Sequence, residues 1–309
     1  MRILIYRALG LGDLLTAVPA LRAIRRAHPA ALITLAGPAA LGDLAVLSGA
    51  VDRVHDAAPL APLAPADLAE VELAVNLHGR GPQSTAVLQA LRPARLVSYG
   101  LTSTWRPDEH EVSRWCRLVA EAGMPADPLD LRLVRPVTAA PVEDAVVLHP
   151  GAAFGARRWP AERWATVARG LSDGRHRVVV TGGPGEVGLA EEVAGASGLP
   201  AEAVLAGRTS ALQLAALVAS ARLVIAPDTG VAHLATAYGT PSVLLFGPTP
   251  PALWGPPTSQ PQHRVLWAGQ VGDPCAPDPD PGLLALSADQ VLAEALDALR
   301  AATPPTVRR

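Results

Sequence analysis

The sequence predicts an α/β protein of two domains, each built on a parallel β-sheet covered by helices. Short apolar runs alternate with amphipathic segments along the chain, and this alternation is typical of a parallel sheet. The chain has 309 residues, more than one hydrophobic core usually serves, so two domains are expected. A proline-rich stretch around Pro136–Pro141 separates two halves of similar rhythm and is the best candidate for a linker.

Apolar periodicity assigns most elements of both halves. The expected strands are Ile3–Tyr6, Leu32–Ala36, Leu73–Asn76, Arg95–Tyr99, Ala145–Leu148, Arg177–Thr181, Leu223–Ala226 and Ser242–Phe246. The expected helices are Asp13–Ala27, Ser84–Leu91, Glu111–Ala122, segments starting near Pro160, Glu186 and Thr229, and then Ala211–Ser220 and Ala288–Ala302. Pro19 inside the first helix predicts a kink or a late start. Residues 247–282 are rich in proline and glycine and are expected to form an irregular loop.

Composition argues against several classes of function. The net charge is -2, so bulk attraction to nucleic acid is not expected, although all 26 basic residues are arginine. The two cysteines, Cys116 and Cys275, support neither a disulfide framework nor a zinc site. No apolar stretch reaches the roughly 18 residues that span a bilayer. Met1–Tyr6 leads directly into a strand pattern rather than a signal peptide. We therefore expect a cytoplasmic protein with at most peripheral membrane contact.

The most informative motif is the turn Asp228-Thr229-Gly230, which follows an apolar strand and opens a helix. The start of a helix offers unpaired N–H groups and about half a positive charge, which favour a phosphate. His233 lies off the buried face of this helix and close to the same end. The turn therefore suggests a seat for a diphosphate. An ordinary βαβ unit with Asp228 as a helix cap is an equally weighted alternative at this point.

A second glycine turn, Gly10 to Asp13, follows the first strand. It begins like the dinucleotide-binding fingerprint, but Leu15 stands where the third glycine is needed, and Gly37 follows the second strand in place of an acidic residue. An NAD site is therefore not expected. The turn exposes Asp13 at a helix N-terminus, where the carboxylate could act as a general base or, more commonly, as a helix cap.

Three further turns follow predicted strands. Arg157 and Arg158 precede a helix and could bind an anion, although paired arginines are usually solvated. In the turn Gly182–Glu186, glycines permit close approach of a ligand and Glu186 could accept hydrogen bonds from ribose hydroxyls; a flexible turn is at least as common. His78–Gly81 is either a glycine-rich turn or a contact to a substrate.

Taken in this order, the GLGD turn, the HPG…RRWP loop, GGPGE and PDTGVAH resemble glycosyltransferase family 9, the ADP-heptose heptosyltransferase family. The resemblance covers nearly the whole chain and is most specific in the second half. It implies the GT-B architecture, with two Rossmann-like domains facing across a cleft. Residues 1–140 would form the acceptor domain and residues 141–309 the nucleotide-sugar domain, whose last helix could pack back on the first domain.

The resemblance also implies roles for individual residues. Asp13 matches the proposed catalytic base of an inverting, metal-independent transfer that needs no cofactor. The residues expected around the donor diphosphate are Arg157, Arg158, Asp228, Thr229, Gly230 and His233. Those expected near the nucleoside are Gly183, Glu186 and Gly207, and those near the acceptor or the cleft are Gly12, His78 and Arg80. The expected partners are a nucleoside diphosphate sugar, ADP-linked, and a hydroxyl acceptor such as a lipopolysaccharide core, another glycan or a metabolite, bound by a monomer.

Two features depart from a simple match. Arg157 stands where the family usually has lysine, so a planar fork replaces a compact ammonium. Asp278-Pro279-Asp280 has the spacing of a DxD metal motif, but its proline-rich setting predicts a solvated loop. Two other functions remain open: a sugar-nucleotide epimerase on the same fold, which the placement of Asp13 argues against, and a nucleotide-binding module without transfer activity.

Overall fold

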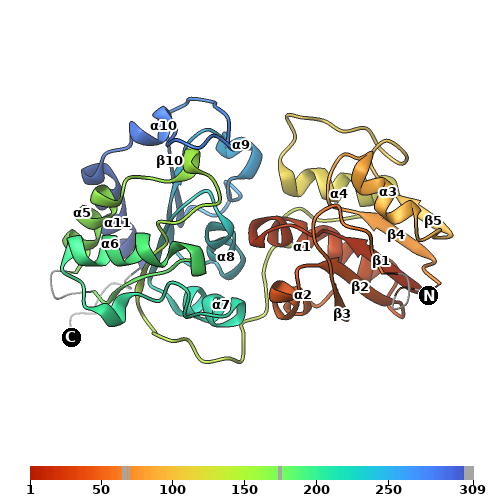
Figure 1. The fold of residues 1–309 in the computed structure, drawn as a ribbon, viewed down its shortest axis with the longest axis horizontal. Coiled ribbons are helices and arrows are strands. Elements are labelled where there is room, and N and C mark those ends of the chain that lie inside the picture. Colours follow the sequence, from red (N-terminus) through yellow and green to blue (C-terminus); the bar gives the residue numbers. More distant parts are fainter. Residues whose placement is uncertain (65–67, 69, 173–175, 303–309) are drawn as a thin grey trace. The chain divides into compact units, whose positions relative to one another are not determined.

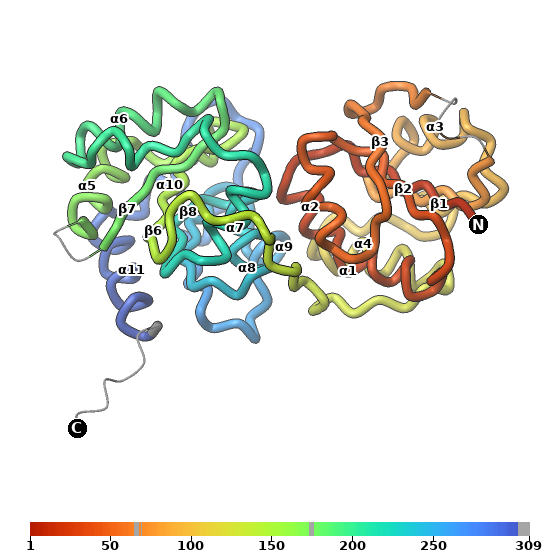
Figure 2. Tube along the Cα trace, turned by 90° about the horizontal axis from the view of Figure 1, so that it is seen from below, coloured from red at the N-terminus to blue at the C-terminus, as the bar shows by residue number. Residues whose placement is uncertain are grey.

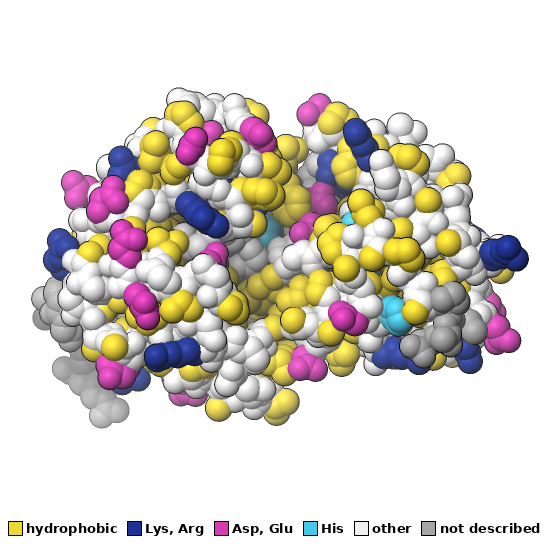
Figure 3. Space-filling view, in the orientation of Figure 1, with side chains coloured by type: hydrophobic (Ala, Val, Ile, Leu, Met, Phe, Trp, Pro, Cys, Tyr) yellow, Lys and Arg dark blue, Asp and Glu magenta, His cyan; other side chains and the backbone are white. Residues whose placement is uncertain are grey.

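The computed structural model describes residues 1–64, 68, 70–172 and 176–302, and it divides into two compact units, Met1–Val134 and Arg135–Arg309. Each unit contains one five-stranded parallel sheet with helices packed on it, as Figures 1 and 2 show. Among the described helices, none is long and apolar enough to cross a membrane. On the face shown in Figure 3, arginine side chains are interspersed with acidic ones rather than gathered into a basic patch.

The first unit has the strand order β3-β2-β1-β4-β5. Its strands are β1 (Arg2–Tyr6), β2 (Leu32–Gly37), β3 (Arg53–Asp56), β4 (Leu73–Asn76) and β5 (Arg95–Val97). Its α-helices are α1 (Leu11–Ala27), α2 (Gly42–Leu47), α3 (Gln83–Gln89) and α4 (Glu111–Glu121). The central strand β1 pairs in parallel with β2 and β4, so that Tyr6 stands beside Ala36 and Asn76. The carboxyl ends of these three strands therefore meet at one edge, where ligands of α/β proteins usually bind.

The second unit has the strand order β10-β9-β8-β6-β7. Its strands are β6 (Val146–Leu148), β7 (Val178–Val180), β8 (Leu223–Pro227), β9 (Ser242–Phe246) and β10 (His263–Trp267). Its α-helices are α5 (Ala161–Leu171), α6 (Val187–Ser197), α7 (Ala211–Ser220), α8 (Gly230–Tyr238), α9 (Pro251–Trp254), α10 (Pro281–Leu284) and α11 (Ala288–Ala302). The core strands are apolar and buried along their whole length, as expected for a sheet covered on both faces.

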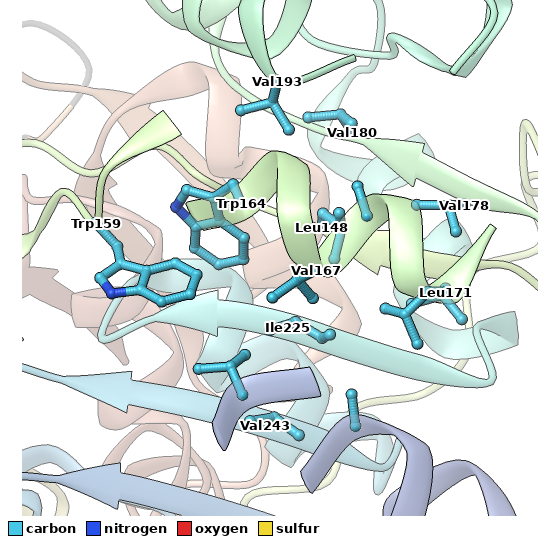
Figure 4. Packing of buried hydrophobic residues seen from close by; sticks show 14 of the residues in the cluster. Leu148, Trp159, Trp164, Val167, Leu171, Val178, Val180, Val193, Ile225 and Val243 are labelled. Carbon is cyan, nitrogen blue, oxygen red and sulfur yellow. The ribbon is translucent and has the colours of Figure 1, made fainter. Parts of the chain in front are cut away.

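Alternate residues of β9 enter two different cores. Val243 joins a large cluster with Trp159, Trp164 and Ile225, shown in Figure 4. Leu244, the next residue, instead packs with residues of α8 and α9. Because successive side chains of a strand point to opposite faces, α8 covers the face opposite to this large cluster. Helix α11 packs against α5 and the strands of its own unit.

Several predictions about elements were wrong. The segment 247–282 is not irregular throughout, since it contains α9, the edge strand β10 and the start of α10. Helices α2 and α9 and strand β3 were not expected. Helix α1 begins at Leu11 and continues through Pro19, so the helix does not start late. Proline removes one backbone donor, and the burial of α1 from Leu14 onward offsets that loss.

Candidate active site

Asp13 lies in the first turn of α1, directly beyond the carboxyl end of β1. It is the third residue of the helix and follows Gly12, while Gly10 occupies the N-cap position. Gly10 has no side chain to cap the helix, and the Asp13 carboxylate interacts with the Gly10 N–H instead. The Asp13 side chain is 30% exposed. The carboxylate is therefore held near the helix start while part of it remains accessible to a substrate.

A buried arginine organises the surroundings of Asp13. The Arg7 side chain, 1% exposed, donates from Nη2 to Asp13 Oδ1 at 3.4 Å and to Thr16 Oγ1 at 3.1 Å. Its Nε also donates to the Asp13 carbonyl and its Nη1 to the Leu77 carbonyl. Thr16 in turn donates to the Asp13 carbonyl at 3.0 Å. Arg7 thus ties the end of β1 to the first turn of α1 and to the end of β4.

The pKa of Asp13 is raised above its ordinary value, chiefly because burial disfavours the charged carboxylate. The positive charge of Arg7 and backbone N–H groups of Gly10 and Asp13 lower the pKa, whereas the negative charge of Glu111 raises it. A carboxylate with a raised pKa is a stronger base than one in water. This property suits a general base.

His78 lies at the end of β4 and is occupied by structural contacts. Its Nδ1 accepts a hydrogen bond from the Ala8 N–H at 3.2 Å, and its ring stacks on Tyr6 with centroids 4.6 Å apart. Burial and the charge of Arg7 lower the pKa of His78 to about 4, so the ring is neutral near pH 7. The neighbouring Arg80 is exposed and lines a pocket of about 420 Å³ with Trp105 and residues 100–104.

In the second unit, the N-terminus of α8 lies beside Arg157. The N-cap is Thr229, not Asp228, and the Thr229 side chain makes no capping hydrogen bond. The first N–H groups of α8, beginning at Gly230, have no partner within the helix and point toward its start. Arg157 Nη1 donates to the Asp228 carbonyl at 3.0 Å, while its buried Nε has no hydrogen-bond partner among the described residues. Positive charge and N–H donors therefore gather here.

Arg158 and His233 are the other two side chains predicted at this site, and their surroundings differ from those of Arg157. Arg158 is exposed, and its Nε donates to the Ala152 carbonyl at 2.9 Å. His233 lies in the first turn of α8, half-buried, with its ring edge-on to Trp254 at a centroid distance of 5.9 Å. Trp254 comes from α9, which the sequence analysis missed. The contact between His233 and Trp254 joins α8 to α9 and could not be predicted from the sequence alone.

Glu186 and the glycines around it form a second group. Glu186 Oε2 accepts a hydrogen bond from the Gly183 N–H at 2.6 Å, and a Cβ at Gly151 would lie 2.1 Å from Oε1. Gly207 has φ +70° and donates from its N–H to the Gly182 carbonyl at 3.0 Å. The structure thus brings the predicted nucleoside-side residues together, at the carboxyl ends of β6 and β7.

His149 lies beside Glu186 in the same region. Its Nδ1 is 3.1 Å from Thr181 Oγ1, and it is buried. Burial lowers the pKa of His149, and the negative charge of Glu186 opposes that shift. The buried His149 imidazole beside Glu186 therefore favours its neutral form.

The Asp278–Asp280 segment is not simply a solvated loop, as had been expected. Asp278 is exposed, but Asp280 is buried and is the N-cap of α10, accepting hydrogen bonds from the Gly282 and Leu283 N–H groups at 2.8 and 3.2 Å. Its carboxylate is therefore engaged as a cap. Among the described residues, no group of three or more His, Cys, Asp or Glu side chains could hold a metal ion.

Two residues near Asp13 were missed by the sequence analysis. Arg7 is a charged residue at the end of an otherwise apolar strand, directly before a glycine turn, and that position was the available signal. Glu111 opens α4, 104 residues further along the chain, and its contact with Arg7 depends on tertiary packing. Asp13 and His78 lie in the first unit, whereas the residues predicted to bind the donor lie in the second.

Comparison with known proteins identifies relatives of the chain. The model of glycosyltransferase family 9 (heptosyltransferase) matches residues 82–279. Lipopolysaccharide heptosyltransferase 2 of Escherichia coli is 35% identical over 121 residues, which cover 38% of this chain and 34% of that relative. Lipopolysaccharide heptosyltransferase 1 of Pseudomonas aeruginosa is 33% identical over 154 residues, covering 48% and 42%. The chain thus spans about a third of the length of the first curated relatives it matches.

Solved structures match over a longer range. A glycosyltransferase family 9 structure from Veillonella parvula has a TM-score of 0.79 at 20% identity, with 97% of both chains covered. The E. coli ADP-heptose lipopolysaccharide heptosyltransferase II structure has a TM-score of 0.77 at 19% identity, with 97% of this chain and 99% of that chain covered. The predicted fold class, two Rossmann-like units of the GT-B type, is confirmed.

Proposed function

This chain belongs to glycosyltransferase family 9, and on that premise we propose that it transfers a sugar from a nucleoside diphosphate donor to a hydroxyl acceptor. The proposed donor is ADP-heptose or a related ADP-linked sugar, and the reaction inverts the anomeric centre without a metal ion. The observation that carries the proposal is the position of the Arg157 guanidinium at the N-terminus of α8, with a buried Nε that has no hydrogen-bond partner among the described residues.

The donor diphosphate would lie at the start of α8. The N–H groups of Thr229 and Gly230 and the guanidinium of Arg157 supply hydrogen-bond donors and positive charge on one side of that site. As the bond to the sugar breaks, the leaving diphosphate gains negative charge, which these fixed donors stabilise without reorganising. Arg157 therefore takes the part that the family usually gives to lysine. Arg158 and His233 would support the outer side of the diphosphate.

The nucleoside would lie beyond β7, over Gly183 and beside Gly207. A Cβ at Gly183 would have only ordinary contacts, so a ribose can approach the backbone there, whereas the Val187 side chain fills that space at Gly207. Glu186 is half-buried and already accepts the Gly183 N–H, which fixes the orientation of its carboxylate. A ribose hydroxyl can donate to that oriented carboxylate, because a carboxylate accepts several hydrogen bonds at once.

Asp13 would act as the general base. The acceptor hydroxyl attacks the anomeric carbon from the face opposite the diphosphate, its proton passes to the Asp13 carboxylate, and the carbon–oxygen bond to the diphosphate breaks. The products are the glycosylated acceptor, the nucleoside diphosphate and protonated Asp13. We propose that the acceptor, a glycan such as a lipopolysaccharide core or a smaller metabolite, binds the unit that carries Asp13. Gly12 and Arg80 would contact it there, and His78 would hold the turn that presents Arg80.

A ligand panel tests the donor half directly. Because a ligand that binds only the native state raises apparent stability, ADP should raise the melting temperature more than UDP, GDP or dTDP at equal concentration. Incubation with ADP-heptose and candidate acceptors, read by mass spectrometry, then separates the functions. A glycosylated acceptor plus ADP supports transfer. An isomerised sugar nucleotide indicates an epimerase, and binding without conversion indicates a non-catalytic module. Light scattering of the same sample tests the expected monomer.

A further inference from the structure

Asp13 belongs to a cluster of four charged side chains, of which the other three are buried. Arg7 Nη2 contacts Asp13 Oδ1 at 3.4 Å and Glu111 Oε1 at 3.3 Å, so one guanidinium nitrogen is shared by two carboxylates. Glu111 is 5% exposed and also binds Arg114 through Oε2. Two arginines thus face two carboxylates, and the cluster is neutral when all four groups are charged.

Glu111 is held rigidly within this cluster. Trp115 Nε1 donates to Glu111 Oε1 at 2.7 Å, which is the same oxygen that accepts from Arg7. The Arg7 guanidinium also lies over the Trp115 ring, 4.8 Å from its centroid. Because α4 packs on α1, Glu111 and Trp115 of α4 reach the same guanidinium that contacts Asp13 of α1. Arg7 is therefore fixed by contacts with both helices.

We propose that Glu111 is a positioning residue for Asp13: it draws the Arg7 guanidinium toward α4, so that Arg7 orients the base without fully neutralising it. The inference rests on the proposed role of Asp13 in transfer. A buried arginine that paired with Asp13 alone would form a close ion pair, which stabilises the ionised carboxylate and weakens it as a base. By sharing Arg7, Glu111 keeps the ion-pair distance of Asp13 long and its basicity high.

The charged groups that act on Asp13 come from each element packed around it. Arg7, directly after β1, lowers the pKa of Asp13, and Glu111 from α4 raises it. Arg114 from α4 binds Glu111 rather than Asp13. His78, after β4, feels the same arginine, and its pKa of about 4 leaves it uncharged where the enzyme would work. Removal of the Glu111 charge should therefore lower the pKa of Asp13.

The test is a carboxyl titration of the complete chain by NMR, with the Asp13 signal assigned by its loss in Asp13→Asn. In Glu111→Gln the amide still accepts from Trp115, but the charge is gone, and the pKa of Asp13 should fall. The acidic limb of the kcat profile should move to lower pH by the same amount. On the plateau of the profile, kcat should fall roughly threefold to tenfold for each unit by which the pKa of Asp13 falls, because the rate of proton transfer decreases with the basicity of the carboxylate. The KM for the donor should stay the same.

A matched control removes a carboxylate from the same region. Glu109 pairs with Arg117 at 2.7 Å and its carboxylate does not contact Arg7, so Glu109→Gln should leave the Asp13 titration unchanged. Glu111→Asp, which retains the charge, should restore part of the wild-type titration. An unchanged Asp13 titration in a folded Glu111→Gln variant would overturn the proposal.

Glu111→Asp keeps the proposal testable if Glu111→Gln does not fold. Its side chain is one methylene shorter and holds the charge farther from Arg7, so the pKa of Asp13 should fall part of the way. An Asp13 titration in Glu111→Asp that is identical to that of the wild type would contradict the inference. The titration needs no substrate, so it is independent of the proposed function. If the pKa of Asp13 depends on Glu111 but the chain shows no turnover, the proposed function is contradicted. If the chain turns over but the pKa of Asp13 does not depend on Glu111, only this inference is contradicted.

Discussion

The carboxylate of Glu186 lies directly against the backbone of Gly151, so that a Cβ at position 151 would stand 2.1 Å from Glu186 Oε1. The same carboxylate accepts the Gly183 N–H at 2.6 Å. Glycine is therefore required at 151 by close approach, because the Glu186 side chain occupies the space of a methyl group. This contact joins the turn after β6 to the turn after β7, where the nucleoside is proposed to bind.

Gly151→Ala should displace Glu186 and disorder the Gly183 turn. We expect ADP affinity to fall at least about tenfold, which corresponds to about 1.4 kcal/mol of binding free energy. Calorimetric titration of ADP measures this change. Gly185→Ala is the matched control, since nothing lies within 4 Å of a Cβ at 185 in the same turn. Equal ADP affinity for the two variants would remove Glu186 from the proposed nucleoside site.

Arg157→Gln should weaken ADP binding while the fold is retained. The variant removes the positive charge and the bond to the Asp228 carbonyl, and a charge-assisted contact to a phosphate contributes roughly 1.5–3 kcal/mol. ADP affinity should fall about tenfold to a hundredfold. Arg169→Gln, an exposed change on α5, serves as the control. If AMP and ADP bind the wild-type chain equally well, Arg157 does not hold the diphosphate.

Helix α8, whose N-terminus forms the proposed diphosphate site, could be predicted from local sequence signals. Pro227 ends β8, and Gly239 at φ +68° ends α8, as its sequence position had indicated. Strand β10 could not be predicted in the same way. It is a short edge strand in a proline-rich segment, and its residues pair with β9, which a local pattern does not reveal.

The charged environment of Asp13 is a further case that the sequence did not reveal. Asp13 itself follows a recognisable glycine turn, but its chemistry depends on Arg7 and on Glu111, which is 104 residues from Arg7. Such contacts form through packing of α4 on α1 and leave no short-range signature.

Chelation should leave donor binding intact. The proposed seat uses Arg157 and the N-terminus of α8, and no described cluster of three His, Cys, Asp or Glu side chains could hold a metal. Calorimetric ADP titrations with and without EDTA should agree within a few-fold. A loss of more than about tenfold, roughly 1.4 kcal/mol, would contradict the metal-free mechanism.

Asp13→Asn should stabilise the protein slightly at neutral pH. Burial raises the pKa of Asp13 in the folded state above its value in the unfolded chain. The protonated side chain therefore favours folding at low pH, and this contribution to stability is lost as the pH rises through the pKa of the folded state. Asparagine has no charge to desolvate. The melting temperature of the variant should match or exceed that of the wild type by up to a few degrees at pH 7, and the difference should shrink near pH 4. A clear loss of stability at pH 7 would show that the ionised Asp13 supports the fold.

The most direct test of the whole account is the turnover of Asp13→Asn with ADP-heptose and the acceptor identified by mass spectrometry. The variant retains the shape of the side chain but cannot accept the proton. We predict a fall in kcat of roughly 100- to 10,000-fold, with ADP affinity unchanged within a few-fold because the donor residues lie in the other unit. Near-wild-type turnover by Asp13→Asn would contradict the assignment of Asp13 as the base.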